Sequence, residues 1–140
     1  MKDIYILFVS ALVLGLSFAS CNEDDDSSNS SAQLEGKWIF SKEGSITDGN
    51  EELWDYEGNE DGCSKDYIMV NSNGSLTDVD YDSTDSPCQM FTTNGTWTRS
   101  GNNLTINIEE ISFTGEIVNL TSRELKLKFD NVYIIVFTRG

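Results

Sequence analysis

Three cysteines carry most of the chemistry open to this sequence, because the chain contains no histidine. The lack of histidine excludes His-based catalytic triads, His general bases and metal sites that need an imidazole ligand. Cys63 and Cys88 do not follow a Cys-x-x-Cys spacing. In an exported protein two such cysteines most simply form one disulfide. We therefore predict a Cys63–Cys88 bond that ties the segment 55–64 to the loop at Pro87.

The third cysteine, Cys21, ends a segment that is typical of export. Lys2 precedes an apolar run from Ile4 to Ala19, which is shorter than the ~20 residues that cross a bilayer as a helix. Leu16-Ser17-Phe18-Ala19-Ser20 then leads directly into Cys21. This resembles the bacterial lipobox, although Leu is commoner where Phe18 stands. The resemblance implies that residues 1–20 are a cleaved signal peptide and that Cys21 carries the lipid that binds a membrane. A plain secretory signal with an incidental cysteine, or an uncleaved anchor, is the alternative.

Residues 21–32 combine an acidic run, Asn22–Asp26, with a serine-rich stretch. Polar sequence of this kind cannot bury a core and behaves as a flexible tether. An acidic run just after a lipidated cysteine also resembles the signal that sends lipoproteins of the Bacteroidota to the outer face of the outer membrane. The resemblance implies a lipid-anchored outer-membrane protein exposed at the cell surface. A merely solvated linker is the alternative.

The charge balance excludes one class of partner. The chain has 24 acidic and 9 basic residues and a net charge of −15. Such a field repels nucleic acid, so we expect no nucleic-acid partner. No pair of carboxylates stands in an apolar context of the kind that raises a pKa for glycoside hydrolysis. We therefore expect neither enzymatic activity nor a cofactor.

Two acidic clusters invite a calcium hypothesis, because carboxylate oxygens are the ligands that this ion prefers. Asp78, Asp80 and Asp82 alternate along one strand face, and residues 48–62 are dense in Asp and Glu. Neither cluster has the EF-hand spacing, since Ser83 occupies the sixth position counted from Asp78. Aspartates at alternate positions also describe an ordinary solvent-facing strand. We assign no metal site and leave calcium binding open.

The elements that must position these residues are strands. From Gln33 onward, short apolar segments with a period of two alternate with turns rich in Gly and Asn. Eight segments qualify as strands: 38–40, 66–70, 76–81, 95–99, 104–108, 113–120, 124–129 and 132–137. The last is apolar on both faces, so we expect it to lie centrally or to close the sheet against the first strand. Residues 33–140 are thus predicted to form one all-β domain, a small eight-stranded antiparallel up-and-down barrel.

Short motifs along this domain resemble known proteins. Gly36-Lys37-Trp38 looks like the Gly-x-Trp signature of lipocalins. The layout as a whole is similar to the short lipocalin-like domains of Bacteroidota lipoproteins. The matching segments are Leu34–Trp38, Tyr67–Leu76, Gly95–Trp97, Leu104–Ile106, Ile117–Thr121 and Leu125–Leu127. The resemblance implies a barrel able to enclose a cavity. It also implies that Gly36, Trp38 and Arg139 are structural, with Arg139 lying over Trp38 as a cation–π pair.

The candidate ligand contacts are two aromatic residues of the long loop after the first strand and three rows expected to point inward. They are Trp54, Tyr56, Tyr67, Met69, Leu104, Ile106, Leu125 and Leu127. The aromatic residues could instead pack down and order their loop. The inward rows either line a cavity or fill it, and the small size of the barrel favours filling.

Our leading functional hypothesis is a non-enzymatic, lipid-anchored barrel that binds a small apolar or amphipathic ligand. The alternative is a filled barrel that acts as an interaction or structural module at the cell surface. Such a module would contact an envelope protein or a glycan through loops 43–62 and 82–95.

Overall fold

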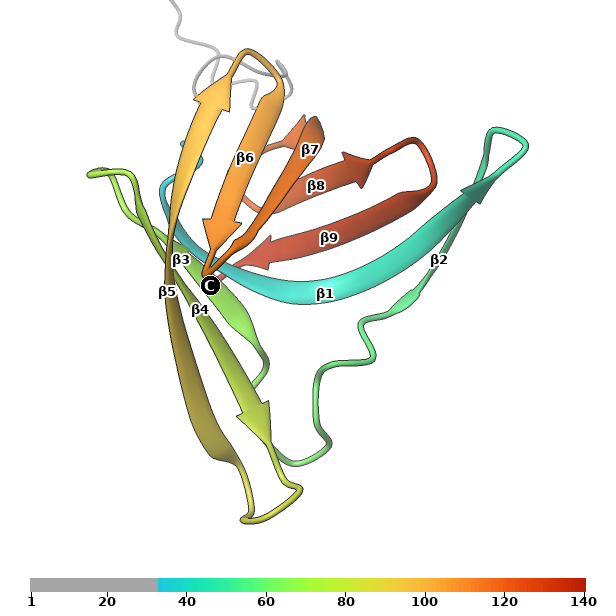
Figure 1. The fold of residues 1–140 in the computed structure, drawn as a ribbon. Coiled ribbons are helices and arrows are strands. Elements are labelled where there is room, and N and C mark those ends of the chain that lie inside the picture. The colour runs from blue at the N-terminus through green and yellow to red at the C-terminus, as the bar shows by residue number, and fades with distance from the viewer. Residues whose placement is uncertain (1–32) are drawn as a thin grey trace, which may run out of the picture.

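Nine strands make up the part of the chain that the computed structural model describes, residues 33–140 (Figure 1). They are β1 (Gly36–Thr47), β2 (Asn50–Asp55), β3 (Tyr67–Val70), β4 (Ser75–Asp82), β5 (Gln89–Ser100), β6 (Asn103–Ile108), β7 (Ile111–Leu120), β8 (Glu124–Phe129) and β9 (Tyr133–Arg139). No helix long and apolar enough to cross a membrane occurs in this range. The predicted signal peptide 1–20 and the tether 21–32 with Cys21 lie outside the described residues.

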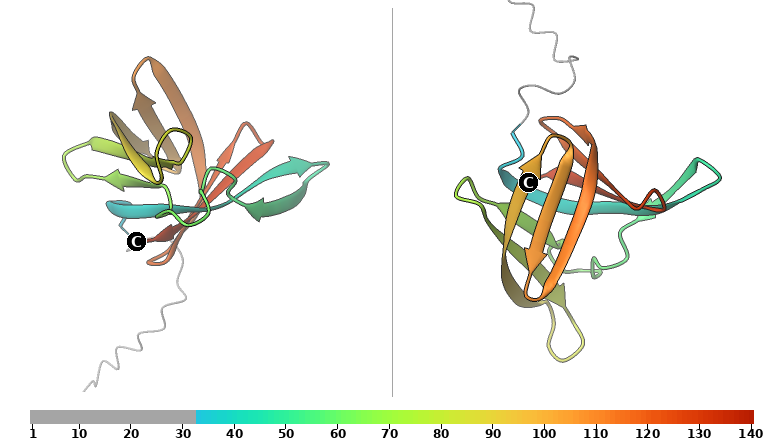
Figure 2. Two further views of the ribbon diagram at one scale, coloured as in Figure 1. Left: turned by 90° about the horizontal axis from the view of Figure 1, so that it is seen from below. Right: turned by 45° about the horizontal axis from the view of Figure 1, so that its top comes forward.

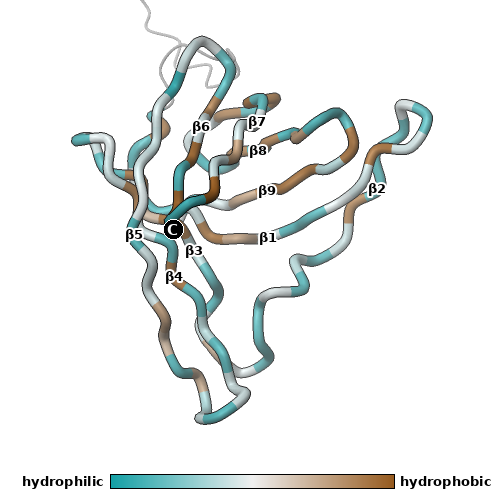
Figure 3. Tube along the Cα trace, viewed as in Figure 1, coloured by the Kyte–Doolittle hydropathy of each residue, from teal (hydrophilic) through white to brown (hydrophobic). Residues whose placement is uncertain are grey.

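Eight of the strands close into a ring. Each pairs antiparallel with the next in the order β1, β3, β4, β5, β6, β7, β8 and β9, and β9 pairs again with β1. Figure 2 shows the sheet curling round from two further directions. The predicted eight-stranded antiparallel barrel is confirmed. Strand β9, which is hydrophobic along most of its length (Figure 3), closes the ring as expected. Both of its faces are buried, because Ile134 on the outer side is as inaccessible as Phe137 on the inner side.

Strand β2 stands outside the ring, and the sequence analysis missed it. It pairs only with β1, from Lys42 opposite Asp55 to Thr47 opposite Asn50, and this hairpin extends away from the barrel (Figures 1 and 2). The expected loop over 43–62 is therefore wrong for most of its length. Asp48 and Gly49 both have positive φ, as a two-residue hairpin turn requires.

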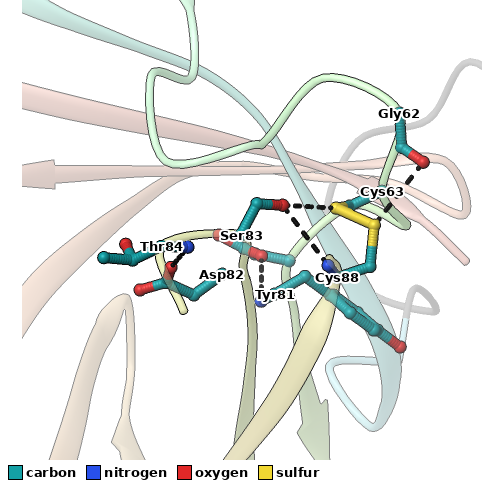
Figure 4. The surroundings of a disulfide bond; sticks show 8 residues. Gly62, Cys63, Tyr81, Asp82, Ser83, Thr84 and Cys88 are labelled. Carbon is teal, nitrogen blue, oxygen red and sulfur yellow. Dashed lines mark hydrogen bonds between the residues drawn. A yellow bond between two sulfur atoms is a disulfide. The ribbon is translucent and has the colours of Figure 1, made fainter. Parts of the chain in front are cut away.

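The second expected loop, 82–95, is also mostly strand. Strands β4 and β5 pair from Ser75 opposite Thr96 to Asp82 opposite Gln89, so only residues 83–88 connect them. Cys88, in this connection, forms the predicted disulfide with Cys63, with 5.3 Å between their Cα atoms (Figure 4). The backbone N–H of Cys88 donates to the Ser83 hydroxyl at 3.3 Å. The bond thus ties the segment before β3 to the β4–β5 connection.

One end of the barrel is closed around Trp38, which is 0 % exposed. The guanidinium of Arg139 lies 3.8 Å from the Trp38 ring centre and donates to the carbonyl of Glu35 at 2.7 Å. The Trp38 indole N–H donates to the carbonyl of Leu34 at 2.6 Å. A side chain at Gly36, whose φ is +124°, would place its Cβ 2.5 Å from the Arg139 guanidinium. The three residues singled out by the resemblance therefore meet at the closed end.

Candidate functional site

A cavity of about 650 Å³ lies inside the barrel. Its apolar lining consists of Phe40, Ile68, Ile106, Ile108, Phe113, Leu127, Phe129, Ile135 and Phe137. Its polar lining consists of Asp78, Ser112, Thr114, Asp130 and Tyr133. The volume falls within the roughly 300–1,000 Å³ typical of small-molecule sites. The expectation that side chains fill the whole interior is therefore wrong.

The cavity arises because the inward rows are filled at one end only. On β8, Leu125 is fully buried in the closed-end core, whereas Leu127 and Phe129 further along line the cavity. On β6, likewise, Leu104 is buried in the core and Ile106 lines the cavity. Successive inward residues on a strand lie about 7 Å apart, so they belong to different layers of the barrel. Of these predicted ligand contacts, Ile106 and Leu127 line the cavity, and Leu104 and Leu125 support it from below.

The predicted inward row on β3 is wrong. Ile68 and Val70 are buried in the core, and Ile68 lines the cavity. Tyr67 and Met69 alternate with them and therefore lie on the outer face. Apolar residues stand on both faces of this four-residue strand, so periodicity could not tell which face is inner.

The two aromatic residues of the segment expected to be a long loop, Trp54 and Tyr56, lie in different places. Trp54 lies on β2, outside the ring, and is 38 % exposed. Tyr56 follows β2 and stacks on Phe40, a cavity residue, with 4.6 Å between the ring centres. Burial, together with the nearby charge of Asp66, raises the pKa of Tyr56 to about 12. Tyr56 therefore buttresses the wall of the cavity as a neutral phenol, and Trp54 does not contact it.

Asn59 closes a break in this wall that the sequence analysis did not foresee. Strand β1 pairs with β3 only as far as Ile39. Just beyond, the Asn59 side chain donates to the carbonyl of Phe40 at 2.9 Å and accepts the N–H of Asp66 at 2.9 Å. The Phe40 N–H donates to the carbonyl of Asp66 at 3.0 Å. These bonds tie β1 to the start of β3 through the loop between them.

Carboxylates occupy the inner face of the wall near β4. Asp78 lines the cavity, and Asp66 is only 2 % exposed. One Asp66 oxygen accepts the backbone N–H of Tyr81 at 2.9 Å. Burial, and secondarily the charge of Asp80, raises the pKa of both Asp66 and Asp78 to about 6. The expectation that no pair of carboxylates stands in a desolvating context is therefore wrong, as is the solvent-facing interpretation of Asp78.

A further carboxylate, that of Glu43 on β1, is bonded to a lining residue of β9. The Tyr133 hydroxyl, which belongs to the lining, donates to a carboxylate oxygen of Glu43 at 2.5 Å. The other oxygen of Glu43 accepts the backbone N–H of Glu57 at 3.1 Å. Burial and the bond to Glu43 raise the pKa of Tyr133 above its ordinary value. Acidic groups thus adjoin the apolar lining at two places, at β4 and where β1 pairs with β9.

No metal centre is apparent among residues 33–140, where no three Cys, Asp or Glu side chains gather closely enough to hold an ion. In particular, the acidic residues of 48–62 and the alternating aspartates of β4 do not converge on a common point.

Comparisons with known proteins agree with this geometry. A family model described as a lipocalin-like domain matches residues 34–127. The fold resembles the crystal structure of a lipocalin-like protein from Bacteroides uniformis, with a TM-score of 0.58, 16% identity, and coverage of 76% of this chain and 98% of that one. It also resembles an uncharacterized protein from Bacteroides eggerthii, with a TM-score of 0.56, 12% identity, and coverage of 77% and 100%. No curated protein matches the chain.

Proposed function

Because this chain belongs to the lipocalin-like domain family, we propose that its barrel binds one small apolar or amphipathic molecule. The observation that carries the proposal is the cavity of about 650 Å³ with nine apolar lining side chains. A ligand that buries about 300 Å² of apolar surface there gains roughly 7 kcal/mol before the cost of association is subtracted.

A cavity-filling variant tests this proposal. The tryptophan of Ile108→Trp would occupy space where the cavity now lies, since Ile108 is a lining residue. We expect the variant to bind the neutral fluorescent probe N-phenyl-1-naphthylamine at least about tenfold more weakly, a loss of about 1.4 kcal/mol. Titration of the probe, followed by its emission, gives the affinity.

The matched control is Thr98→Trp, which adds the same side chain at an exposed position on the neighbouring strand β5. The control should bind the probe as the unchanged protein does. Both variants must first show the same circular dichroism as the parent. Equal probe affinity in a folded Ile108→Trp protein, or no probe binding to the parent, would refute the proposal.

We further propose that acyl chains on Cys21 hold the barrel at the outer membrane, with the acidic run directing it to the cell surface. The lipobox-like residues before Cys21 and the polar tether after it support this. Two or more acyl chains give durable membrane binding, whereas one is marginal. We expect Cys21→Ser to abolish incorporation of labelled palmitate and to release the protein from the membrane fraction.

Surface exposure is tested on intact cells. Added protease should digest the parent protein, and replacement of Asp24, Asp25 and Asp26 by asparagine should protect it without loss of the acyl label. If the parent is digested only after permeabilisation, the acidic run is linker alone. If Cys21→Ser remains membrane-bound, the anchor lies elsewhere.

A second candidate function is contact with an envelope protein or glycan through the β1–β2 and β4–β5 hairpins. Large apolar side chains favour it: Leu53 and Trp54 on β2 and Met90 and Phe91 on β5 are all exposed. Exposed aromatic and methionine side chains are typical of protein contact surfaces. This function does not need the cavity, so it predicts that Ile108→Trp leaves the partner bound and that Trp54→Ala or Phe91→Ala releases it.

A further inference from the structure

The cavity contains carboxylates and, among its described lining residues, neither lysine nor arginine. We propose that it selects a ligand with a positively charged head group, such as a lipophilic amine or a quaternary ammonium with an alkyl chain, over anionic lipids such as fatty acids. This inference rests on the proposed ligand-binding function and names the class of ligand. The Asp78 carboxylate is the group that we assign to the head of the ligand.

Asp78 is placed to meet a ligand inside the barrel. It lies opposite Ile68 in the pairing of β3 with β4, and both residues line the cavity. Leu76, two residues before Asp78 on the same face, is buried in the closed-end core. The strand therefore runs from an apolar floor to a carboxylate, an arrangement that matches an amphipathic molecule inserted tail first.

The negative charge at this wall is not neutralised by basic side chains. The charges of Asp80 and Asp66 help to raise the pKa of Asp78, and the charge of Asp80 helps to raise the pKa of Asp66. The ion pairs formed within residues 33–140 lie elsewhere: Lys42–Asp55, Lys126–Glu51 and Lys128–Glu116. Glu43, on β1, bonds to a neutral tyrosine and a backbone N–H.

An anionic head group would therefore find no basic side chain in the described lining, and it would be repelled by the carboxylates. A cation at Asp78 instead forms an ion pair in a partly desolvated site and relieves the repulsion among the three aspartates. The net charge of −15 adds a general attraction for cations, which salt screens over about 10 Å. An ion pair inside the cavity is screened much less. Added salt should therefore weaken the general attraction by the net charge and leave the pairing with Asp78 largely intact.

Binding of a cation should also depend on pH. The pKa of Asp78 is about 6, above its ordinary 3.8, because of burial and the charges of Asp80 and Asp66. The groups that share this wall are Asp66 before β3, Asp80 on β4 and Tyr56 after β2. Protonation of Asp78 removes the partner of the cation. The affinity for a permanently charged ligand should therefore be full above pH 7 and fall as the pH is lowered through about 6.

Three competitors with the same ten-carbon chain test the inference: decyltrimethylammonium, decanol and decyl sulfate. Each displaces N-phenyl-1-naphthylamine from the unacylated full chain (Cys21→Ser), well below its micelle concentration and at 150 mM salt. We expect the ammonium to compete at about tenfold lower concentration than the sulfate, with decanol between them. Asp78→Asn should remove most of that preference and its pH dependence. Asp61→Asn, in an exposed loop position, should leave the preference intact.

The outcomes separate the two claims. If the probe and decanol bind but the sulfate competes as well as the ammonium, the charge selectivity is wrong and the cavity function stands. If Asp78→Asn and Asp61→Asn reduce the preference for the ammonium equally, the preference comes from the overall charge of the protein. The role assigned to Asp78 would then be wrong. If neither the probe nor decanol binds, the proposed function fails and this inference fails with it.

Discussion

Replacement of Trp38 by alanine is expected to lower the free energy of unfolding by about 3–5 kcal/mol, the usual cost of removing a large buried aromatic side chain. The ring is 0 % exposed and belongs to the closed-end core with Leu34. The change also removes the hydrogen bond to the Leu34 carbonyl and the surface on which the Arg139 guanidinium lies. A loss of this size is a large part of the stability of a small domain.

Urea unfolding followed by circular dichroism measures this effect. The matched control is Trp54→Ala, because Trp54 lies on β2 outside the ring and is 38 % exposed. We expect the control to lose less than about 1 kcal/mol, as is usual for substitutions near the surface. Similar losses in the two variants would mean that Trp38 does not form the floor of the barrel.

Removal of the disulfide by Cys63→Ser and Cys88→Ser is expected to lower the free energy of unfolding by about 3 kcal/mol, from the entropy of the loop that the bond closes in the unfolded chain. The two cysteines are 25 residues apart in sequence. The loop includes Asp66 and Asp78, so the loss should be accompanied by weaker probe binding at that wall.

Reduction supplies the control for this experiment. Dithiothreitol should lower the urea midpoint of the parent protein to that of the double variant and leave the double variant unchanged. A parent protein whose midpoint does not respond to reductant, or that shows two free thiols when unfolded without reductant, would contradict the bond.

The closed barrel could be predicted from local features. The residues of β9 are apolar on both faces, and such a strand is stable only between two neighbours. Asp130 and Asn131 form the turn before it, both with positive φ, as their residue types suggest. Gly36 and Trp38 indicated where the barrel begins. Each of these features depends on residues that are adjacent in the sequence, so each could be predicted without knowledge of the tertiary structure.

What the sequence did not reveal depends on closure of the ring. Whether Ile68 or Tyr67 faces inward is decided by the register with β1 and β4, not by the strand itself. Asp78 looks solvent-facing in sequence because two further aspartates follow at alternate positions. It faces a cavity because β4 continues past the closed-end core. The β1–β2 hairpin, by contrast, was signalled by Asp48-Gly49, a strong two-residue turn motif.

The central claim is that a ligand enters the barrel, and methyl NMR tests it most directly. With isoleucine methyl groups labelled, addition of decanol should shift the resonances of Ile106, Ile108 and Ile135, which line the cavity, and the shifts should saturate at one equivalent. Ile39, which pairs with Tyr67 on the outer face of the barrel, should not respond. Shifts confined to Ile39, or unsaturable shifts without change at the isoleucines that line the cavity, would contradict the account.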